Sequence, residues 1–213
     1  MRTFLRIGPS LMILSLFVLQ GCTKPESLEP AKYLPWIAAE DNGLVRTKAV
    51  NHVTMRARFL PADYLAYREF MNSDNVSFDT VRKSYACGLS FQVSLQADKS
   101  DKVYGNLIQY GLQGDRDFLN RSTVLSFDIQ NFISLKYKSK TILPVLSQYE
   151  GYNAIANSLS FQVVFQLQDY GCGDVTKDFD DVTLVFEDPY WNLGVNQFLF
   201  QKNSLTSIPK LKF

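Results

Sequence analysis

Two stretches of strict alternation between apolar and polar residues constrain the fold of this chain most. In residues 85–96, the apolar side chains are Tyr85, Cys87, Leu89, Phe91, Val93 and Leu95. Residues 159–167 show the same pattern, with Leu159, Phe161, Val163, Phe165 and Leu167. A period of two places such side chains on one face of a strand and the polar ones on the other. Each stretch therefore predicts a half-buried strand of an antiparallel sheet.

Further segments carry shorter patterns of the same kind. We predict strands at residues 52–59, 103–110, 124–130, 133–137, 182–186 and 197–201, and an edge strand at 208–213. One short helix is predicted over residues 60–71, with Pro61 at its first position. Strands of this length without alternating long helices are typical of an all-β fold, mainly an antiparallel β-sandwich or a partly open barrel. An immunoglobulin-like topology is one option, although no Trp lies between Cys87 and Cys172.

The five residues Leu-Ser-Phe-Gln-Val occur twice, at 89–93 and 159–163, and residues 125–129 are a looser copy. The residues that follow each copy do not match. We therefore interpret the three segments as strands that share one core, and not as units of a repeat protein.

The first residues have the layout of a signal peptide. Arg2 and Arg6 precede an apolar run over residues 11–19, which is about half the roughly 20 residues that a membrane-spanning helix needs. The run ends in Leu19-Gln20-Gly21-Cys22, which resembles the lipobox of bacterial lipoproteins. The resemblance implies cleavage before Cys22 and acylation of its thiol and new amino terminus, with palmitate as the expected label. The alternative is an ordinary secretory peptide that leaves Cys22 as a plain thiol.

The same resemblance implies a location. In Gram-negative lipoproteins, an Asp directly after the acylated Cys resembles an inner-membrane retention signal. In this chain the residue after Cys22 is Thr23. We therefore expect a lipid-anchored protein of the outer membrane. We divide the chain into a signal peptide (1–21), an acylated Cys with a flexible, proline-rich tether (22–35) and a single β-rich domain (36–213).

The charges and cysteines fit an exported chain. Lys and Arg number 22 against 21 Asp and Glu, and cleavage removes Arg2 and Arg6, so the mature protein is nearly neutral. A neutral chain gives no reason to expect a nucleic-acid partner. With Cys22 acylated, Cys87 and Cys172 are candidates for a disulfide, although Cys87 could equally be a small core residue.

Few residues point to catalysis. His52 is the single histidine, which excludes a zinc site with several histidines, and we predict it to be a solvent-facing strand residue. We predict no catalytic residue, no cofactor and no metal. The acidic residues Asp174, Asp178, Asp180 and Asp181 are a weak candidate for calcium, with a solvated acidic loop as the alternative.

The best candidate for binding is the turn after the strand at 182–186. Asp188, Tyr190 and Trp191 could contact a glycan or a peptide, although Trp191 could instead fold back as a core plug. We expect a non-catalytic envelope lipoprotein, held on the membrane by its lipid, that acts as a binding or accessory domain for another envelope protein or a glycan. The alternatives are a glycan hydrolase with paired carboxylates and a purely structural envelope subunit.

Overall fold

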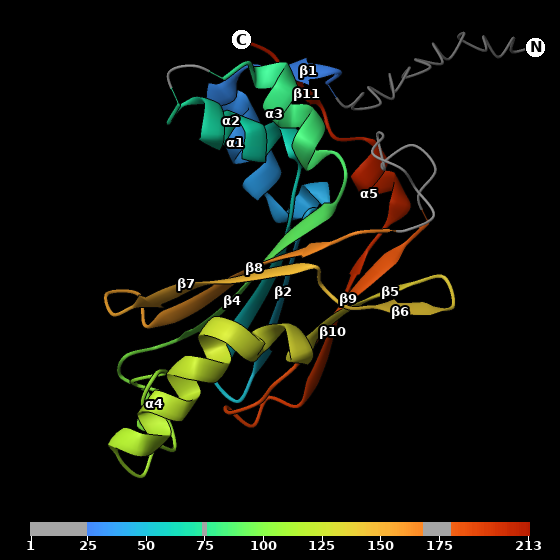
Figure 1. The fold of residues 1–213 in the computed structure, drawn as a ribbon. Coiled ribbons are helices and arrows are strands. Elements are labelled where there is room, and N and C mark those ends of the chain that lie inside the picture. The colour runs from blue at the N-terminus through green and yellow to red at the C-terminus, as the bar shows by residue number, and fades with distance from the viewer. Residues whose placement is uncertain (1–24, 74–75, 168–179) are drawn as a thin grey trace, which may run out of the picture.

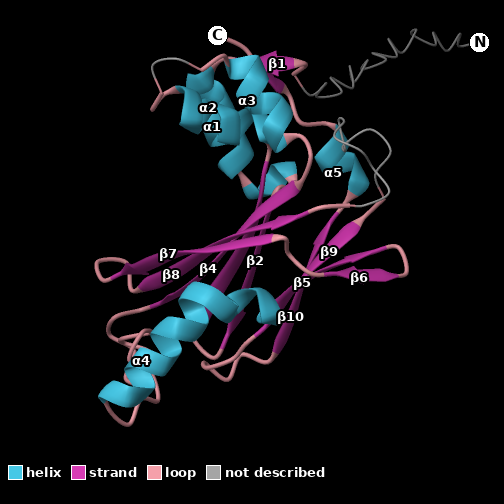
Figure 2. Ribbon diagram, in the orientation of Figure 1, coloured by secondary structure: helices cyan, strands magenta, loops and turns pink. Residues whose placement is uncertain are grey.

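The structure is a computed structural model that describes residues 25–73, 76–167 and 180–213. Its described residues form a β-rich fold with three sheets (Figures 1 and 2). The largest sheet has the strand order β2-β3-β4-β8-β7, and every neighbouring pair in it is antiparallel. Its strands are β2 (Val45–Val50), β3 (Val53–Leu60), β4 (Leu89–Ala97), β8 (Ser158–Phe165) and β7 (Leu146–Asn153).

The second sheet has the order β10-β9-β5-β6 and is also antiparallel. Its strands are β10 (Val195–Phe200), β9 (Val182–Glu187), β5 (Ile133–Tyr137) and β6 (Lys140–Ile142). A third, two-stranded sheet pairs β1 (Ser27–Leu28) in parallel with β11 (Lys210–Leu211). β11 forms the predicted edge strand, but over two residues only.

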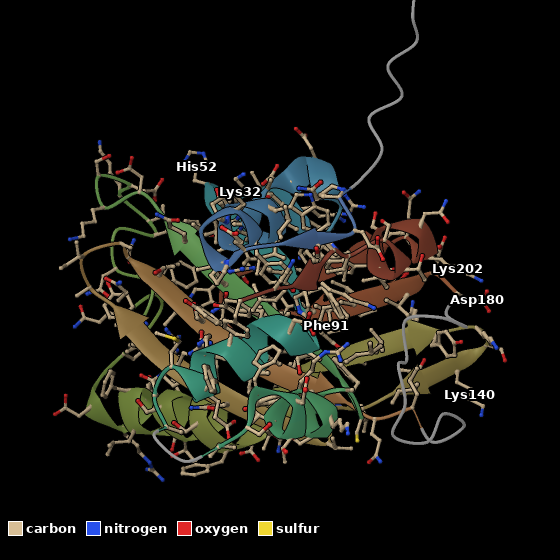
Figure 3. The ribbon with its side chains drawn as sticks, turned by 90° about the horizontal axis from the view of Figure 1, so that it is seen from above. Lys32, His52, Phe91, Lys140, Asp180 and Lys202 are labelled. Carbon is tan, nitrogen blue, oxygen red and sulfur yellow. The ribbon has the colours of Figure 1, made fainter. Side chains whose placement is uncertain are left out.

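The two alternating stretches lie side by side, as the shared pattern predicts. Phe91 of β4 pairs with Val163 of β8, and Val93 pairs with Phe161. All four side chains are buried in one core that also contains buried residues of the second sheet. Phe91 lies in the middle of the molecule, whereas His52 and Lys140 lie at its rim (Figure 3).

Helices are more numerous than the single one predicted. The predicted helix is α2 (Ala62–Phe70), and the described residues contain four more: α1 (Pro30–Ala38), α3 (Phe78–Tyr85), α4 (Asp115–Thr123) and α5 (Lys202–Thr206). Short 3-10 turns η1 (Glu40–Asn42) and η3 (Ile129–Phe132) and a π-helical turn η2 (Val124–Asp128) complete the list. α1, α2 and α3 lie with β1 and β11 at one end, and α4 lies at the opposite end (Figure 1).

Helix α1 occupies the last six residues of the predicted tether. Pro30 stands in the first turn of α1, where its missing N–H costs nothing, and Pro35 lies inside the helix. Tyr33 and Ile37, four residues apart, are both fully buried. From Ser27 onward the chain is therefore part of the folded domain, in contrast to the tether predicted over residues 22–35.

Two predicted strands are wrong. Residues 103–110 form a series of turns. Residues 124–130 are helical, with Leu125 and Ile129 buried and Phe127 72% exposed. Leu125 and Ile129 are four residues apart, a spacing that suits one face of a helix as well as one face of a strand. The looser copy of the five-residue motif therefore does not share the strand conformation of the other two.

The predicted strand at 85–96 begins later than the alternation suggests. Tyr85 ends helix α3, and β4 starts at Leu89 after Gly88. Gly88 lies close to the neighbouring strand: an added Cβ would stand 2.9 Å from a methyl group of Val164.

In the described part of the chain, no helix is both long and apolar enough to cross a membrane.

Candidate functional site

The predicted binding turn follows β9 and is organised by one carboxylate. Asp188 accepts hydrogen bonds from the backbone N–H groups of Tyr190 (2.9 Å), Trp191 (2.9 Å) and Leu193 (2.6 Å). The Asp188 N–H in turn donates to the carbonyl of Gly194 at 3.1 Å. Because its oxygens hold the turn, the Asp188 side chain has a structural role.

Trp191 points into the core. Its side chain is 0% exposed, and its indole Nε1 donates to the carbonyl of Leu107 at 2.9 Å. The Tyr104 hydroxyl donates to the Trp191 carbonyl at 3.0 Å, so the turn is tied twice to the segment at 103–110. The prediction that Trp191 contacts a ligand is therefore wrong, and the core-plug alternative describes it.

Tyr190 points the other way, toward helix α4. The guanidinium carbon of Arg121 lies 4.6 Å from the centre of the Tyr190 ring, in reach of a cation–π contact. Arg121 is only 5% exposed, and its Nη1 donates to the carbonyl of Ile108 at 3.1 Å. Burial lowers the pKa of Arg121. Burial also raises the pKa of Tyr190, and the positive charge of Arg121 opposes this rise. Tyr190 and Arg121 thus fasten α4 to the body of the protein.

Helix α4 and the turn η2 that follows it expose three large apolar side chains among polar ones. We define the α4–β7 surface as six exposed residues on α4, η2, the segment before β7 and the first residue of β7: Phe118, Leu119, Phe127, Leu143, Val145 and Leu146. Side-chain hydrogen bonds join its two halves. Ser147 Oγ donates to Gln130 Oε1, and Gln130 Nε2 donates to the Phe127 carbonyl, both at 2.6 Å. Exposed large apolar residues that lie together are typical of interaction sites on soluble domains.

Local structure explains why Phe127 is exposed. In η2 the backbone is π-helical, a form that occurs mostly as single turns and often at functional sites. Leu125 and Ile129 fill the core on either side, so Phe127 between them faces solvent. No core role accounts for this aromatic residue, which makes it the centre of the candidate site.

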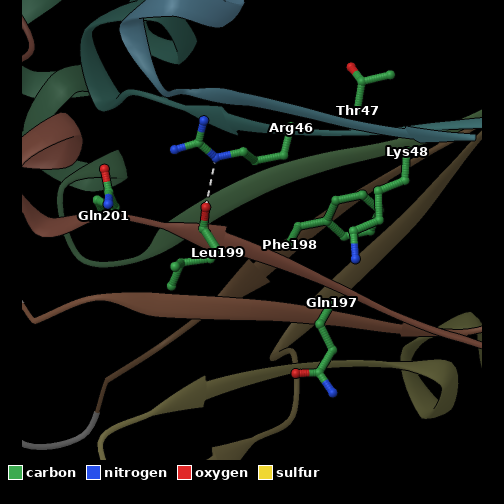
Figure 4. A pocket seen from close by; sticks show the side chains of 7 residues that line it. All are labelled: Arg46, Thr47, Lys48, Gln197, Phe198, Leu199 and Gln201. Atoms are coloured by element: carbon green, nitrogen blue, oxygen red, sulfur yellow. Dashed lines mark hydrogen bonds between the residues drawn. The ribbon is translucent and has the colours of Figure 1, made fainter.

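A second candidate is the hollow between β2 and β10, the edge strands of the two larger sheets (Figure 4). Its volume is about 340 Å³. Arg46 Nε donates to the Leu199 carbonyl at 2.7 Å, and Lys48 Nζ lies 5.5 Å from the centre of the Phe198 ring. The lining has two cations and no carboxylate, so it does not supply the acid pair that a glycan hydrolase needs.

His52 was predicted to be a strand residue, but it lies in a turn. Asn51 and His52 both have positive φ values, 47° and 67°, in the two-residue turn between β2 and β3. The His52 side chain is exposed, and its Nδ1 lies 2.8 Å from Oδ2 of Asp101. Asp101 also accepts the N–H groups of Val103 and Tyr104, and these bonds lower its pKa. The pair joins the hairpin to the loop after β4.

The predicted acidic cluster is only partly described, since Asp174 and Asp178 lie outside the described residues. Asp180 Oδ2 lies 3.7 Å from Lys138 Nζ, and Asp181 Oδ1 accepts the N–H of Lys202 at the start of α5. The two acids thus have different partners. Within the described ranges, no group of three or more His, Cys, Asp or Glu side chains could hold a metal ion.

Cys87 is disulfide-bonded. The other two cysteines, Cys22 and Cys172, lie outside the described residues, so the pairing of Cys87 with Cys172 and the acylation of Cys22 stay predictions.

The comparisons with known proteins give little guidance on function. No protein-family model and no curated protein matches the chain. A crystal structure of a novel protein of unknown function from Burkholderia pseudomallei K96243 aligns over 85% of this chain and 94% of that chain, with 11% identity and a TM-score of 0.37. This likeness is too weak to support an argument about either fold or function.

Proposed function

We propose that this protein is a non-catalytic, lipid-anchored lipoprotein of the outer membrane that binds another envelope protein through the α4–β7 surface. The lipobox-like sequence at Cys22 supports the anchor. The observation that carries the binding role is the group of large apolar side chains exposed around Phe127.

The position of this surface suits such a role. α4 lies at the end of the molecule opposite β1, which begins five residues after Cys22 (Figure 1). A partner in the envelope could therefore reach α4 while the lipid holds the other end of the domain. Leu, Val and Phe side chains are the kind that form the buried centre of a protein–protein interface, and the exposed Asp128 and the polar residues of α4 suit its polar rim.

We also propose that the two larger sheets form a β-sandwich or partly open barrel. Both sheets bury side chains in one core, and β2 and β10 lie next to each other across the seam that Arg46 bridges. At this seam the two sheets come close to forming a continuous wall.

The binding role is tested with Phe127→Lys. Affinity-tagged wild-type protein and the variant are purified from detergent-solubilised envelopes, and the co-purified proteins are compared. A central aromatic contact contributes about 2 kcal/mol or more, so the partner's affinity should fall on the order of 30-fold. Ile155→Lys, at an exposed apolar position in the turn between β7 and β8, is the matched control and should retain the partner. Equal recovery of the partner with Phe127→Lys, in a protein with unchanged circular dichroism, contradicts the proposal.

The anchor is tested separately. Wild-type protein should take up a palmitate label and fractionate with membranes, whereas Cys22→Ser should take up no label and appear in the soluble fraction. An unlabelled wild type, or a Cys22→Ser variant that stays on the membrane, contradicts the lipoprotein assignment.

A further inference from the structure

Four aromatic rings, two exposed and two half-buried, form a cluster at the end of the domain that carries β1. We define the Phe213 cluster as Tyr67 and Phe70 of α2, Phe78 of α3, and Phe213. The ring centre of Phe213 lies 5.8 Å from that of Tyr67, 5.6 Å from that of Phe70 and 4.8 Å from that of Phe78. Even with these three contacts, Phe213 is 61% exposed, and the exposed side chains of Met71 and Val76 extend the patch.

The cluster lies close to the point where the chain arrives from Cys22. Leu28 of β1 pairs with Leu211, and the Lys212 N–H donates to the Leu28 carbonyl at 2.9 Å. Phe213 is the next residue, so it is held beside the start of α1. Cys22 precedes Ser27 by five residues, which reach about 17 Å when fully extended. A lipid on Cys22 therefore keeps β1, and the cluster with it, near the membrane surface.

Charges around the cluster are of both signs. Arg68 and Lys212 are exposed beside it, and so are Glu69 and Asp79. Such a surface has no electrostatic preference for anionic lipids. Aromatic and other large apolar side chains among charged ones are instead typical of protein segments that enter the interface between lipid headgroups and acyl chains.

We propose that the Phe213 cluster inserts into the interface of the bilayer that holds Cys22 and so orients the domain. This inference rests on the lipid anchor of the proposed function. The inserted rings hold α2 and α3 against the lipid, which turns α4 and the α4–β7 surface away from the membrane. A few side chains do not replace an acyl chain as an anchor, but they restrict the rotation of a domain that is already anchored.

The test uses the full-length lipidated protein with Phe213→Trp in phosphatidylcholine vesicles. Some vesicles contain lipids brominated near the headgroup end of the acyl chains, which quench a Trp inserted about 5–10 Å into the interface. We expect Phe213→Trp to lose more emission than wild-type protein, whose own Trp36 and Trp191 supply the background. Phe127→Trp, an aromatic exchange at the opposite end, is the matched control and should lose no more than wild type. High salt should leave the quenching unchanged.

A second variant guards against a local disturbance at the first position. Phe70→Trp places the probe on α2, and it should be quenched in the same way. If neither variant is quenched beyond wild type in protein that floats with the vesicles, the inference is wrong and the anchor stands. If wild-type protein carries no palmitate and does not float, the proposed function and this inference are both wrong.

A second copy of the chain is the competing occupant of the cluster. In that case Cys22→Ser protein would be a dimer in solution, and Phe213→Ser would convert it to a monomer. Light scattering distinguishes these states, and such a dimer would overturn the membrane assignment. If Cys22→Ser protein is a monomer with or without Phe213→Ser, and Phe213→Trp is quenched in vesicles, the membrane assignment is supported.

Discussion

Replacing Trp191 by Ala should destabilise the protein strongly, because the indole has a structural role. Truncation of a buried Trp to Ala costs about 3–5 kcal/mol through lost burial and the cavity left behind. The Leu107 carbonyl also loses the indole N–H as its hydrogen-bond donor, and an unpaired buried acceptor costs about 1–3 kcal/mol. We therefore expect the free energy of unfolding to fall by about 5 kcal/mol, with a drop in Tm of about 10–20 °C for a domain of this size.

The assay is urea unfolding followed by far-ultraviolet circular dichroism, since the substitution removes one of the two tryptophans on which a fluorescence signal would depend. Trp191→Phe keeps a ring but no donor, and should cost about 2 kcal/mol. Phe127→Ala removes an exposed ring and should change the free energy of unfolding by less than about 0.5 kcal/mol.

A loss below about 1.5 kcal/mol for Trp191→Ala would refute the reasoning, because it would mean that the indole is not packed as described. The result also bears on binding experiments. A lost partner in Trp191→Ala would report a destabilised domain, so Phe127 and not Trp191 is the residue to test for contact.

Three other predictions concern the residues that hold the loops. Asn157→Ala should lower the free energy of unfolding, measured in urea, by about 3 kcal/mol. The reason is that the fully buried Asn157 side chain forms hydrogen bonds with Ala97, Tyr104, Leu107 and Tyr152. A loss no larger than that of Asn153→Ala, at an exposed position, would contradict this. Dithiothreitol should lower Tm, because opening the Cys87 disulfide costs about 2–4 kcal/mol, and an unchanged Tm in fully thiol-labelled protein would oppose it. The pKa of Asp101 is lowered in the folded state, so its charge stabilises the fold above the unfolded pKa of about 3.9, and this contribution is lost as the pH falls through the folded value. The difference in free energy of unfolding between wild type and Asp101→Asn should therefore shrink in acid, and a constant difference from neutral pH to acid would count against it.

The strands were predictable where one face is buried along the whole strand. β3, β4, β8 and β10 each alternate buried residues with half-buried or exposed ones over most of their length, and the core they share follows from that pattern. In β9 the residues Val182, Leu184 and Phe186 of one face are all buried, and Val185 of the other face is buried too. Leu125 and Ile129 show its limit, because a separation of four residues fits both a strand and a helix. Only the packing of η2 and η3 against β7 separates the two alternatives.

The loops depend on partners far away in the chain. Residues 103–110 are rich in aliphatic and aromatic side chains, as a strand would be, but the Asn157 amide and the Trp191 indole bind their backbone, from about 50 and 84 residues away. Helix α1 was hidden by its two prolines, which read locally as a linker. Exposure of Phe127, the centre of the candidate site, likewise follows from the helical turn and could not be read from a period-two pattern.

The Asn157 contacts have a consequence for the order in which the chain folds. Asn157 stands at the start of β8 with a φ of 48°, and its amide reaches the loop after β4 only when β4 and β8 are already paired. We therefore expect the loop, and the Trp191 turn that docks on it, to form after the main sheet. Contacts made this late contribute little to the folding transition state and mainly slow unfolding. Asn157 thus governs how long the native state persists more than how fast it is reached.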